Sequence, residues 1–423
     1  MGRVRLMPAP TEPRGRRSLG RDFRLVWWAV VISSTGDGMF ITAFPLLAAR
    51  LTSDPVLIAG VTVAQRLPWL VASLFMGALA DRFDRRRLMV MADVARFVVV
   101  GLFGLGVVFD VVNIWSLYAC AFLLTVGETL HVSAGQAVLP AIVEPSDLLQ
   151  ANSRFGIAQI SSAQFVGPPL GAAAFNLAVS VPFLADAVTF AGSAALIGAL
   201  PDEHGVTKPT TRFRDDVREG LRFTWSNRAV RRITVLLAVI NVFYFAATSL
   251  LVLYTKQRLH AGSAVYSAMF VSAGLGTILT RAYLGSLVRR VGEIRAMALS
   301  FWFWTLPIIT LAFTTTAWVA VSSYFLLGTG TGLWIALNTT IRQRLTPMRL
   351  LGRMSAVYRF VSWGVVPFGA ALGGVLARVF SLTTPFFIGG VAMLFIGLFG
   401  RRLLRPVEQA LAEQGQTEPD LGN

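Results

Sequence analysis

The chain has 423 residues, of which 55% are hydrophobic and 14% are charged. Soluble domains usually carry roughly 25% charged residues, and the mean hydropathy here is +0.63. This composition excludes a large soluble catalytic domain and predicts an integral membrane protein. The net charge of +16 comes almost entirely from arginine, because Lys208 and Lys256 are the only lysines. Such a charge is typical either of nucleic-acid binding or of an asymmetric membrane topology.

Twelve apolar segments follow one another along the chain. A membrane-spanning helix needs about 20 apolar residues, and these runs are much longer than the roughly 10-residue alternating strands of a membrane barrel. We therefore expect an all-α membrane protein with twelve transmembrane helices. The predicted spans are residues 23–49, 56–80, 88–109, 114–138, 153–178, 181–200, 233–254, 264–288, 296–314, 318–341, 355–379 and 385–400.

The basic residues divide unequally between the two sides that these spans define. On the side of the N-terminus lie 31 of the 38, counting Arg24, Arg154 and Arg359 near the ends of their spans. The other side has four, counting Arg378 at the end of its span, and Arg66, Arg96 and Arg281 lie deeper within spans. Because cytoplasmic loops are enriched in Lys and Arg, both termini are predicted to be cytoplasmic in a bacterial plasma membrane. The charge is then explained by topology, and no nucleic-acid partner is expected. The arginine-rich N-terminus is interpreted as a tail before a retained first helix, not as a cleaved signal peptide.

The longest loop divides the chain into two halves of six spans. We expect a cytoplasmic tail (1–22), an N-terminal six-helix bundle (23–200), a linker (201–232), a C-terminal six-helix bundle (233–402) and a second cytoplasmic tail (403–423). In the linker, Val217, Leu221, Thr224 and Trp225 fall on one helical face, which is typical of a helix at the membrane surface.

The two halves also repeat each other in sequence. Residues 77–87 align with 285–295, residues 122–127 with 325–330 and residues 144–149 with 346–351, at offsets of 208, 203 and 202. Three matches in the same order, each at an equivalent loop or span, indicate two pseudo-symmetric bundles. Two parallel halves with a site between them are typical of an alternating-access transporter.

Several motifs resemble those of the major facilitator superfamily. The segment GALADRFDRRR (77–87) is similar to the signature between its second and third spans, although Asp84 stands where the family usually has Gly. VGPPLG (166–171) resembles the fifth-span motif of drug–proton antiporters, with Ala163 in place of the usual upstream Gly. Three further patterns resemble the branch of enterobactin-exporter-like proteins and of actinobacterial tetracycline and multidrug pumps. They are residues 34–38 with 43–47, residues 139–140 with 148–152, and residues 186–190.

The resemblance implies a conformational latch at the cytoplasmic end of the second span. Asp81 would face the N-terminus of the helix starting near Ser355, where free N–H groups favour an anion. The other latch candidates are Gly77, Arg82, Arg85 and Arg86. The alternative is that these arginines only signal topology.

The antiporter motif contributes Gly167, Pro168 and Gly171. Proline bends a helix because it lacks a backbone donor, and the two glycines form a small-residue face against which another helix can pack closely. Gly369 and Gly373 repeat this pattern in the second half. Two explanations fit the motif: it controls how the two halves move against each other during transport, or it only allows ordinary close packing of helices.

Ionisable residues within spans are costly and usually functional. Asp37 and Glu128 are therefore the proton-coupling candidates, with Arg66 and Arg96 as their charge partners. Asp37 and Arg66 are expected at one depth, and Glu128 and Arg96 at another. Two structural ion pairs are the alternative, and Asp93 could instead pair with Arg96. Asp186 is expected to be structural. Asp37 is favoured because its flanking glycines leave room for water or substrate.

Spans one, four, seven and ten line the transport path in the superfamily. This implies five substrate-cavity candidates, namely Phe40, Phe44, Tyr244, Trp334 and Asn338. No catalytic residue, cofactor or metal site is expected: the three histidines lack metal-ligand spacing, and no phosphate-binding loop is present.

We therefore expect a monomeric secondary transporter that exports an amphipathic small molecule, such as a drug or siderophore, in exchange for protons. A metabolite importer or uniporter and a non-transporting sensor on the same fold are the alternatives.

Overall fold

The structure is a computed structural model that describes residues 19–71, 83–144, 147–201 and 213–417. Throughout these ranges the regular structure is helical, without strands. The first half contains α1 (Gly20–Leu51), α2 (Pro55–Val71), α4 (Arg85–Val108), α5 (Ile114–Ile142), α6 (Leu148–Ser161), η1 (Ser162–Val166), α7 (Gly167–Leu177) and α8 (Val181–Gly198).

Residues 213–417 contain the linker helix and the second half. The elements are α9 (Phe213–Ser226), α10 (Arg228–Thr248), α11 (Leu251–Leu253), η2 (Tyr254–Arg258), α12 (Ser263–Val291), α13 (Glu293–Phe313), α14 (Ala317–Arg344), η3 (Met348–Leu350), α15 (Leu351–Gly364), α16 (Val366–Val379) and α17 (Thr384–Thr417). Helix α17 extends beyond the predicted last span, because the residues that follow, rich in Ala, Glu and Gln, favour helix.

The all-α membrane class is confirmed. In the described ranges, ten helices are long and apolar enough to cross a membrane, and Pro55–Val71 is a shorter apolar helix. The predicted fifth span is not among the ten and consists of α6, η1 and α7 in succession. The count of twelve therefore remains a prediction.

The fifth span contains a π-helical turn directly before its proline pair. The N–H of Gly167 donates to the carbonyl of Ser162, five residues earlier. Pro168 and Pro169 follow, and neither has a backbone N–H. The wider turn places the prolines at the start of α7, where their missing donors cost little.

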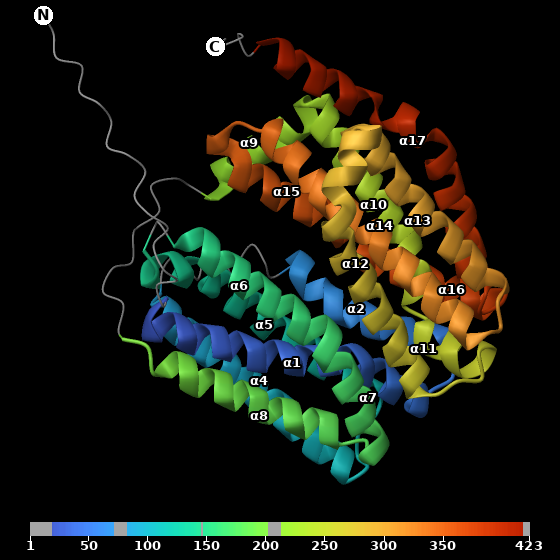
Figure 1. Cartoon of the computed structure of the whole chain (residues 1–423). Helices are drawn as coiled ribbons and strands as arrows, with labels where there is room; N and C mark the ends of the chain where they lie inside the picture. Colours follow the sequence, from blue (N-terminus) through green and yellow to red (C-terminus); the bar gives the residue numbers. More distant parts are fainter. Residues whose placement is uncertain (1–18, 72–82, 145–146, 202–212, 418–423) are drawn as a thin grey trace, which may run out of the picture.

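Within each half the helices pack side by side. In the first half α8 contacts α1 and α4, and α5 contacts α2 and α4. In the second half α14 contacts α12 and α13, and α17 contacts α10 and α13. Figure 1 shows the two groups converging where α2, α7, α11 and α16 meet, and diverging toward the ends of α6 and α9.

We call the end with residues 83–87, 147–154 and 226–232 the arginine-rich end, and the end with residues 52–54, 178–180 and 259–262 the arginine-poor end. Polar contacts join the halves at the arginine-poor end. Ser263 Oγ lies 2.9 Å from Asn176 Oδ1, Lys256 Nζ donates to the carbonyl of Ala49 at 3.2 Å, and Arg378 pairs with Asp54 at 3.4 Å.

The linker helix α9 is joined to α15 by ion pairs. Arg353 pairs with Asp216 at 2.5 Å and also with Glu219. Thr224 is buried, whereas Leu221 and Trp225 are exposed. The predicted apolar face is thus divided: part of it packs against the protein, and Leu221 and Trp225 remain available for lipid.

Candidate functional site

Charged side chains from four helices meet inside the first half. Arg96 on α4 forms an ion pair with Asp37 on α1, and its guanidinium lies 3.8 Å from the centre of the Phe190 ring on α8. The Arg96 side chain is only 4% exposed, whereas that of Asp37 is 32% exposed. Asp37 is therefore the accessible member of a pair whose cation is enclosed, an arrangement that suits exchange of a proton or a cation.

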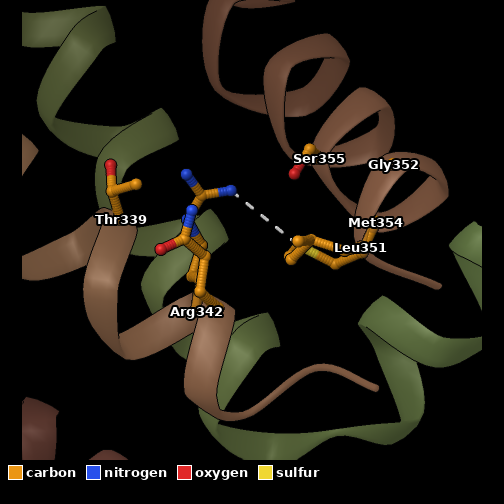
Figure 2. Close-up of a pocket in the computed structure, with 7 residues that line it drawn as sticks. Thr339, Arg342, Leu351, Gly352, Met354 and Ser355 are labelled. Carbon is orange, nitrogen blue, oxygen red and sulfur yellow. Dashed lines mark hydrogen bonds between the residues drawn. The ribbon is translucent and has the colours of Figure 1, made fainter. Parts of the chain in front are cut away.

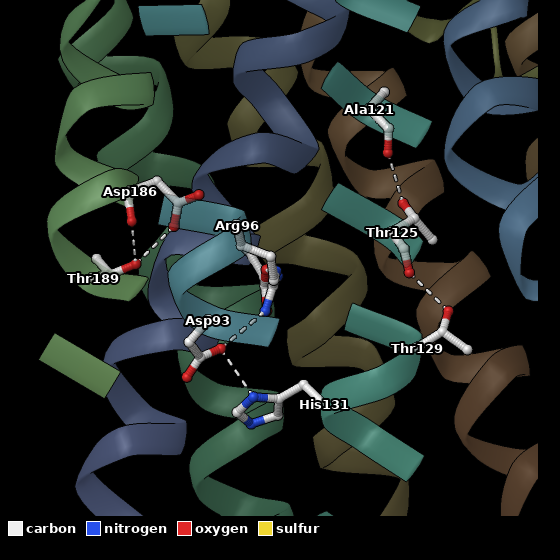
Figure 3. A network of polar contacts seen from close by, with 9 residues as sticks. Asp93, Arg96, Ala121, Thr125, Thr129, His131, Asp186 and Thr189 are labelled. Carbon is white, nitrogen blue, oxygen red and sulfur yellow. Dashed lines mark hydrogen bonds and ion pairs between the residues drawn. The ribbon is translucent and has the colours of Figure 1, made fainter. Parts of the chain in front are cut away.

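Arg96 has a second carboxylate neighbour. Its Nη1 lies 3.9 Å from Asp93 Oδ1, and the same oxygen lies 2.9 Å from Nδ1 of His131 on α5. Figure 3 shows Asp93 between the guanidinium and the imidazole. The Asp93 side chain is fully buried, and neither of its oxygens has a hydrogen bond of good geometry in the described structure.

Sequence reasoning did not identify His131 as part of this site, because it considered the histidines only as metal ligands. A signal was present: Asp93 precedes Arg96 by three residues on one span, and Glu128 precedes His131 by three on the next. Residues three apart share a helical face, so two adjacent spans each present two ionisable groups.

Glu128 interacts electrostatically with Arg96, its expected partner, and also with Arg66. Arg66 and Glu128 attract each other, and the Arg66 guanidinium lies 5.9 Å from the ring centre of Phe245 and 5.7 Å from that of Trp363. The expected pairing at equal depth was wrong for Asp37, which pairs with Arg96. The reason is that α2 packs chiefly against α5 and α16 rather than α1, so Arg66 reaches Glu128 and the aromatic rings of the second half.

The glycines beside Asp37 leave no empty space, contrary to expectation. A Cβ on Gly36 would collide with Asp186 and Thr189, and a Cβ on Gly38 would lie 2.6 Å from the carbonyl oxygen of Ala163. These glycines let α8 and the fifth span approach α1. Asp186 is buried and accepts a hydrogen bond from Thr189 Oγ1 at 2.7 Å, which fits its expected structural role.

The antiporter-motif residues lie in this same contact with α1. A Cβ on Gly167 would lie 2.6 Å from the carbonyl carbon of Gly38, and one on Gly171 would lie 2.5 Å from the Met39 carbonyl oxygen. Thr42 Oγ1 donates to the Pro168 carbonyl at 3.2 Å. The expected close packing is present.

The second half repeats this contact. A Cβ on Gly369 of α16 would lie 2.5 Å from the carbonyl oxygen of Val242 on α10, and Gly373 also meets α10, at Ala246. Each half therefore uses small residues to place one helix directly against another.

The predicted latch is only partly visible. Gly77, Asp81 and Arg82 lie outside the described residues. Arg85 begins α4, and Arg86 donates a hydrogen bond to the carbonyl of Gly198 at the end of α8. Asp84, the departure from the family pattern, caps α4 by accepting from the Arg87 N–H at 2.9 Å. The latch remains a prediction.

The cavity candidates from the first half pack within that half. Phe40 and Phe44 are buried, with ring centres 6.0 and 5.6 Å from that of Phe183 on α8. In the second half, Trp334 is buried, with its ring centre 5.7 Å from that of Trp304 on α13. Their contacts are those of core residues.

Tyr244 and Asn338 have different surroundings. Tyr244 packs edge-on against Phe245, with ring centres 5.2 Å apart, and so lies one side chain from Arg66. Asn338 Nδ2 donates to the Tyr358 hydroxyl at 2.6 Å, and Arg342 Nε donates to Asn338 Oδ1 at 3.1 Å.

A cavity of about 210 Å³ opens beside this second group, between the ends of α14 and α15. Figure 2 shows Arg342 facing Met354 across it, with Thr339 and Ser355 on its walls. It lies in the second half, apart from the Asp37–Arg96 pair. Among the described residues, no group of His, Cys, Asp and Glu could hold a metal ion.

A family model described as transmembrane secretion effector matches residues 19–421. The chain belongs to this family of the major facilitator superfamily. The resemblance seen in the sequence motifs is confirmed, and the family and fold are those of membrane transporters rather than enzymes.

Curated relatives of this transporter include a multidrug efflux pump and a siderophore transporter. It is 26% identical over 411 residues to the multidrug efflux pump Tap of Mycobacterium bovis, covering 94% of this chain and 97% of the pump. It is 22% identical over 360 residues to the staphyloferrin A transporter of Staphylococcus aureus, covering 84% of this chain and 89% of the relative.

Solved structures share its fold. One is a point mutant of the nucleoside transporter NupG, with a TM-score of 0.72 and 11% sequence identity. The match covers 90% of this chain and 100% of the NupG chain. Another is a bacterial homologue of the iron transporter ferroportin in an inward-facing state, with a TM-score of 0.71 and 13% sequence identity. The match covers 92% of this chain and 100% of the homologue's chain.

Proposed function

We propose that this transporter exports an amphipathic small molecule across a bacterial plasma membrane by proton antiport, with both termini in the cytoplasm. The drug and siderophore classes named for its relatives are the first substrates to test. The two bundles, residues 23–200 and 233–402, are the units that would rock against each other, and a monomer would suffice.

The observation that carries the proposal is the Asp37–Arg96 pair. A carboxylate inside a membrane protein is costly, and this one remains 32% exposed while its cation is enclosed. A group that exchanges protons must be reached from water in at least part of the cycle, and it must have a partner that stabilises its ionised form. The partial exposure of Asp37 and its pairing with Arg96 support this role.

Arg66 supports the alternating-access part of the proposal. It interacts with Glu128 of its own half and with two aromatic rings of the other half. A rocking movement would separate Arg66 from those rings and change the surroundings of Glu128. With the arginine-rich end in the cytoplasm, the polar contacts at the arginine-poor end would close the outer side, which corresponds to an inward-open state.

The proposal is tested with the purified protein in liposomes. A pH gradient, acidic on the side opposite the arginine-rich end, is expected to drive tetracyclines, lipophilic cationic drugs or siderophores from a test panel against their own gradient. A protonophore is expected to abolish the movement. Movement down the substrate gradient alone, unaffected by the protonophore, would instead support a uniporter.

The orientation predicts which positions react with an impermeant thiol reagent added to whole cells. Cys120 is buried, so the wild type supplies little background. Thr315→Cys, exposed between α13 and α14, is expected to be labelled from outside. Ser226→Cys, exposed at the end of α9, is expected to be labelled only after the cells are opened. The reverse pattern would invert the topology.

A further inference from the structure

Behind the Asp37–Arg96 pair lies a second, fully enclosed carboxylate with no role in the function proposed above. Asp93 is 0% exposed, and its charged neighbours are His131 at 2.9 Å and Arg96 at 3.9 Å. Arg96 thus stands between two carboxylates, one accessible and one enclosed. An enclosed carboxylate needs a counter-charge, and among the described residues the imidazolium of His131 and the guanidinium of Arg96 are the cations paired with Asp93.

The formal charges of this group determine how many protons it must hold to be neutral. Asp37 and Asp93 contribute two negative charges and Arg96 one positive charge, so the group is neutral only when it holds one further proton. Burying a net charge is unfavourable. Since imidazole is a stronger base than a carboxylate, His131 is the natural site for this proton.

We infer that Asp93 and His131 form a proton-binding site whose occupancy decides whether Arg96 pairs with Asp37 or with Asp93. With the proton bound, the imidazolium neutralises Asp93 and Arg96 pairs with Asp37, which is the pairing in the structure. When His131 loses the proton, Asp93 requires Arg96. Arg96 then leaves Asp37, and the accessible carboxylate is free to take a proton or a cationic substrate.

Two further acids, Glu128 and Asp186, also face this site, and both interact electrostatically with Arg96. Glu128, one turn from His131 on α5, interacts with Arg66. Asp186 on α8 accepts from Thr189 and packs against Gly36. Figure 3 shows Asp186 directed toward Thr189, while His131 is directed toward Asp93. With Glu128 balanced by Arg66 and Asp186 counted in its neutral form, the requirement remains one proton among Asp37, Asp93, Arg96 and His131.

The inference rests on the proposed function, because it supplies the proton that antiport would use, but its test needs no transport. The chain has three histidines, His131, His204 and His260. Nitrogen NMR of the protein labelled with ¹⁵N-histidine in lipid bilayers distinguishes imidazole from imidazolium, and the His131→Asn spectrum identifies the His131 signals. We expect an imidazolium at His131 in the wild type at neutral pH.

The decisive variant is Asp37→Asn, which removes a charge that does not touch His131. Arg96 is then free for Asp93, the group is neutral without a further proton, and His131 is expected to become neutral. Asp37→Glu restores the charge and is expected to restore the imidazolium. If Asp37→Asn does not fold, Asp37→Ser makes the same change in charge.

Glu128→Gln is the matched control, since it removes a carboxylate that also interacts electrostatically with His131, and whose cationic neighbours include Arg66 as well as Arg96. It is expected to leave the imidazolium in place. A neutral His131 in the wild type, an imidazolium that survives Asp37→Asn and Asp37→Ser, or an equal response to Glu128→Gln would each overturn the inference.

A transport measurement separates this inference from the function on which it rests. In liposomes, His131→Asn is expected to lose accumulation driven by the pH gradient, whereas His260→Asn is expected to keep it. His260 is exposed and has φ +48°, a conformation that Asn tolerates. If the wild type itself shows no proton-driven transport, the proposed function fails while the NMR result stands. If the wild type pumps and His131→Asn pumps equally well, only the inference fails.

Discussion

Asp37→Asn is expected to abolish uphill export while leaving the protein folded in the membrane. Removing one partner of a buried ion pair usually costs about 3–5 kcal/mol, because the other charge is left unpaired. Here Asp93 lies 3.9 Å from Arg96 and can replace the lost partner, so much of that cost is avoided. The variant should therefore reach near-normal levels in the membrane, yet it has no accessible group to bind and release the proton.

The measurement uses liposomes with an imposed pH gradient and a second assay without one. Asp37→Asn is expected to lose accumulation but to keep exchange of labelled substrate down its own gradient. Glu128→Gln is the comparison at the other acidic candidate. It removes the attraction between Glu128 and Arg66, while Arg66 keeps its contacts with Phe245 and Trp363. Because the Asp37–Arg96 pair is left in place, we expect a smaller loss. If both variants accumulate substrate at the wild-type rate, neither acid couples transport to protons.

Gly167→Ala is expected to have the largest effect on stability. A Cβ at this position would lie 2.6 Å from the carbonyl carbon of Gly38 and 2.7 Å from the Thr35 carbonyl oxygen. Both atoms belong to the backbone of α1, so no side-chain rotation relieves the overlap, and α7 must move away from α1. Overpacking of this kind usually costs about 1–3 kcal/mol. The expected result is a lower thermal midpoint in detergent, together with reduced transport.

Gly156→Ala is the control for this prediction. Gly156 lies in α6 of the same span, and a Cβ there would meet no atom within 4 Å. Alanine in the interior of a helix is favoured over glycine by about 0.5–1 kcal/mol, so Gly156→Ala should keep or raise the thermal midpoint. Equal midpoints for the two variants would show that the α1–α7 contact tolerates a methyl group.

The sequence by itself determined the class of this protein, and the physical reasons are local. Long apolar runs cannot be soluble and are long enough to cross a bilayer. The unequal distribution of arginines predicts an orientation without any knowledge of packing. The glycines at 167 and 171 indicated a close helix contact, because a residue without a side chain lets a second helix backbone approach closely in any helix pair.

Only the tertiary structure decided which charges meet. Asp37 was expected near Arg66, but the long Arg96 side chain reaches it instead, and Arg66 faces Glu128 and the second half. The glycines beside Asp37 were expected to leave room, but α8 and the fifth span fill it. Asp93 and His131 gave no sign of pairing when each was considered alone. Depth along a span can be counted from the sequence, whereas the rotation of each helix and the choice of its neighbours depend on contacts between segments far apart in the chain.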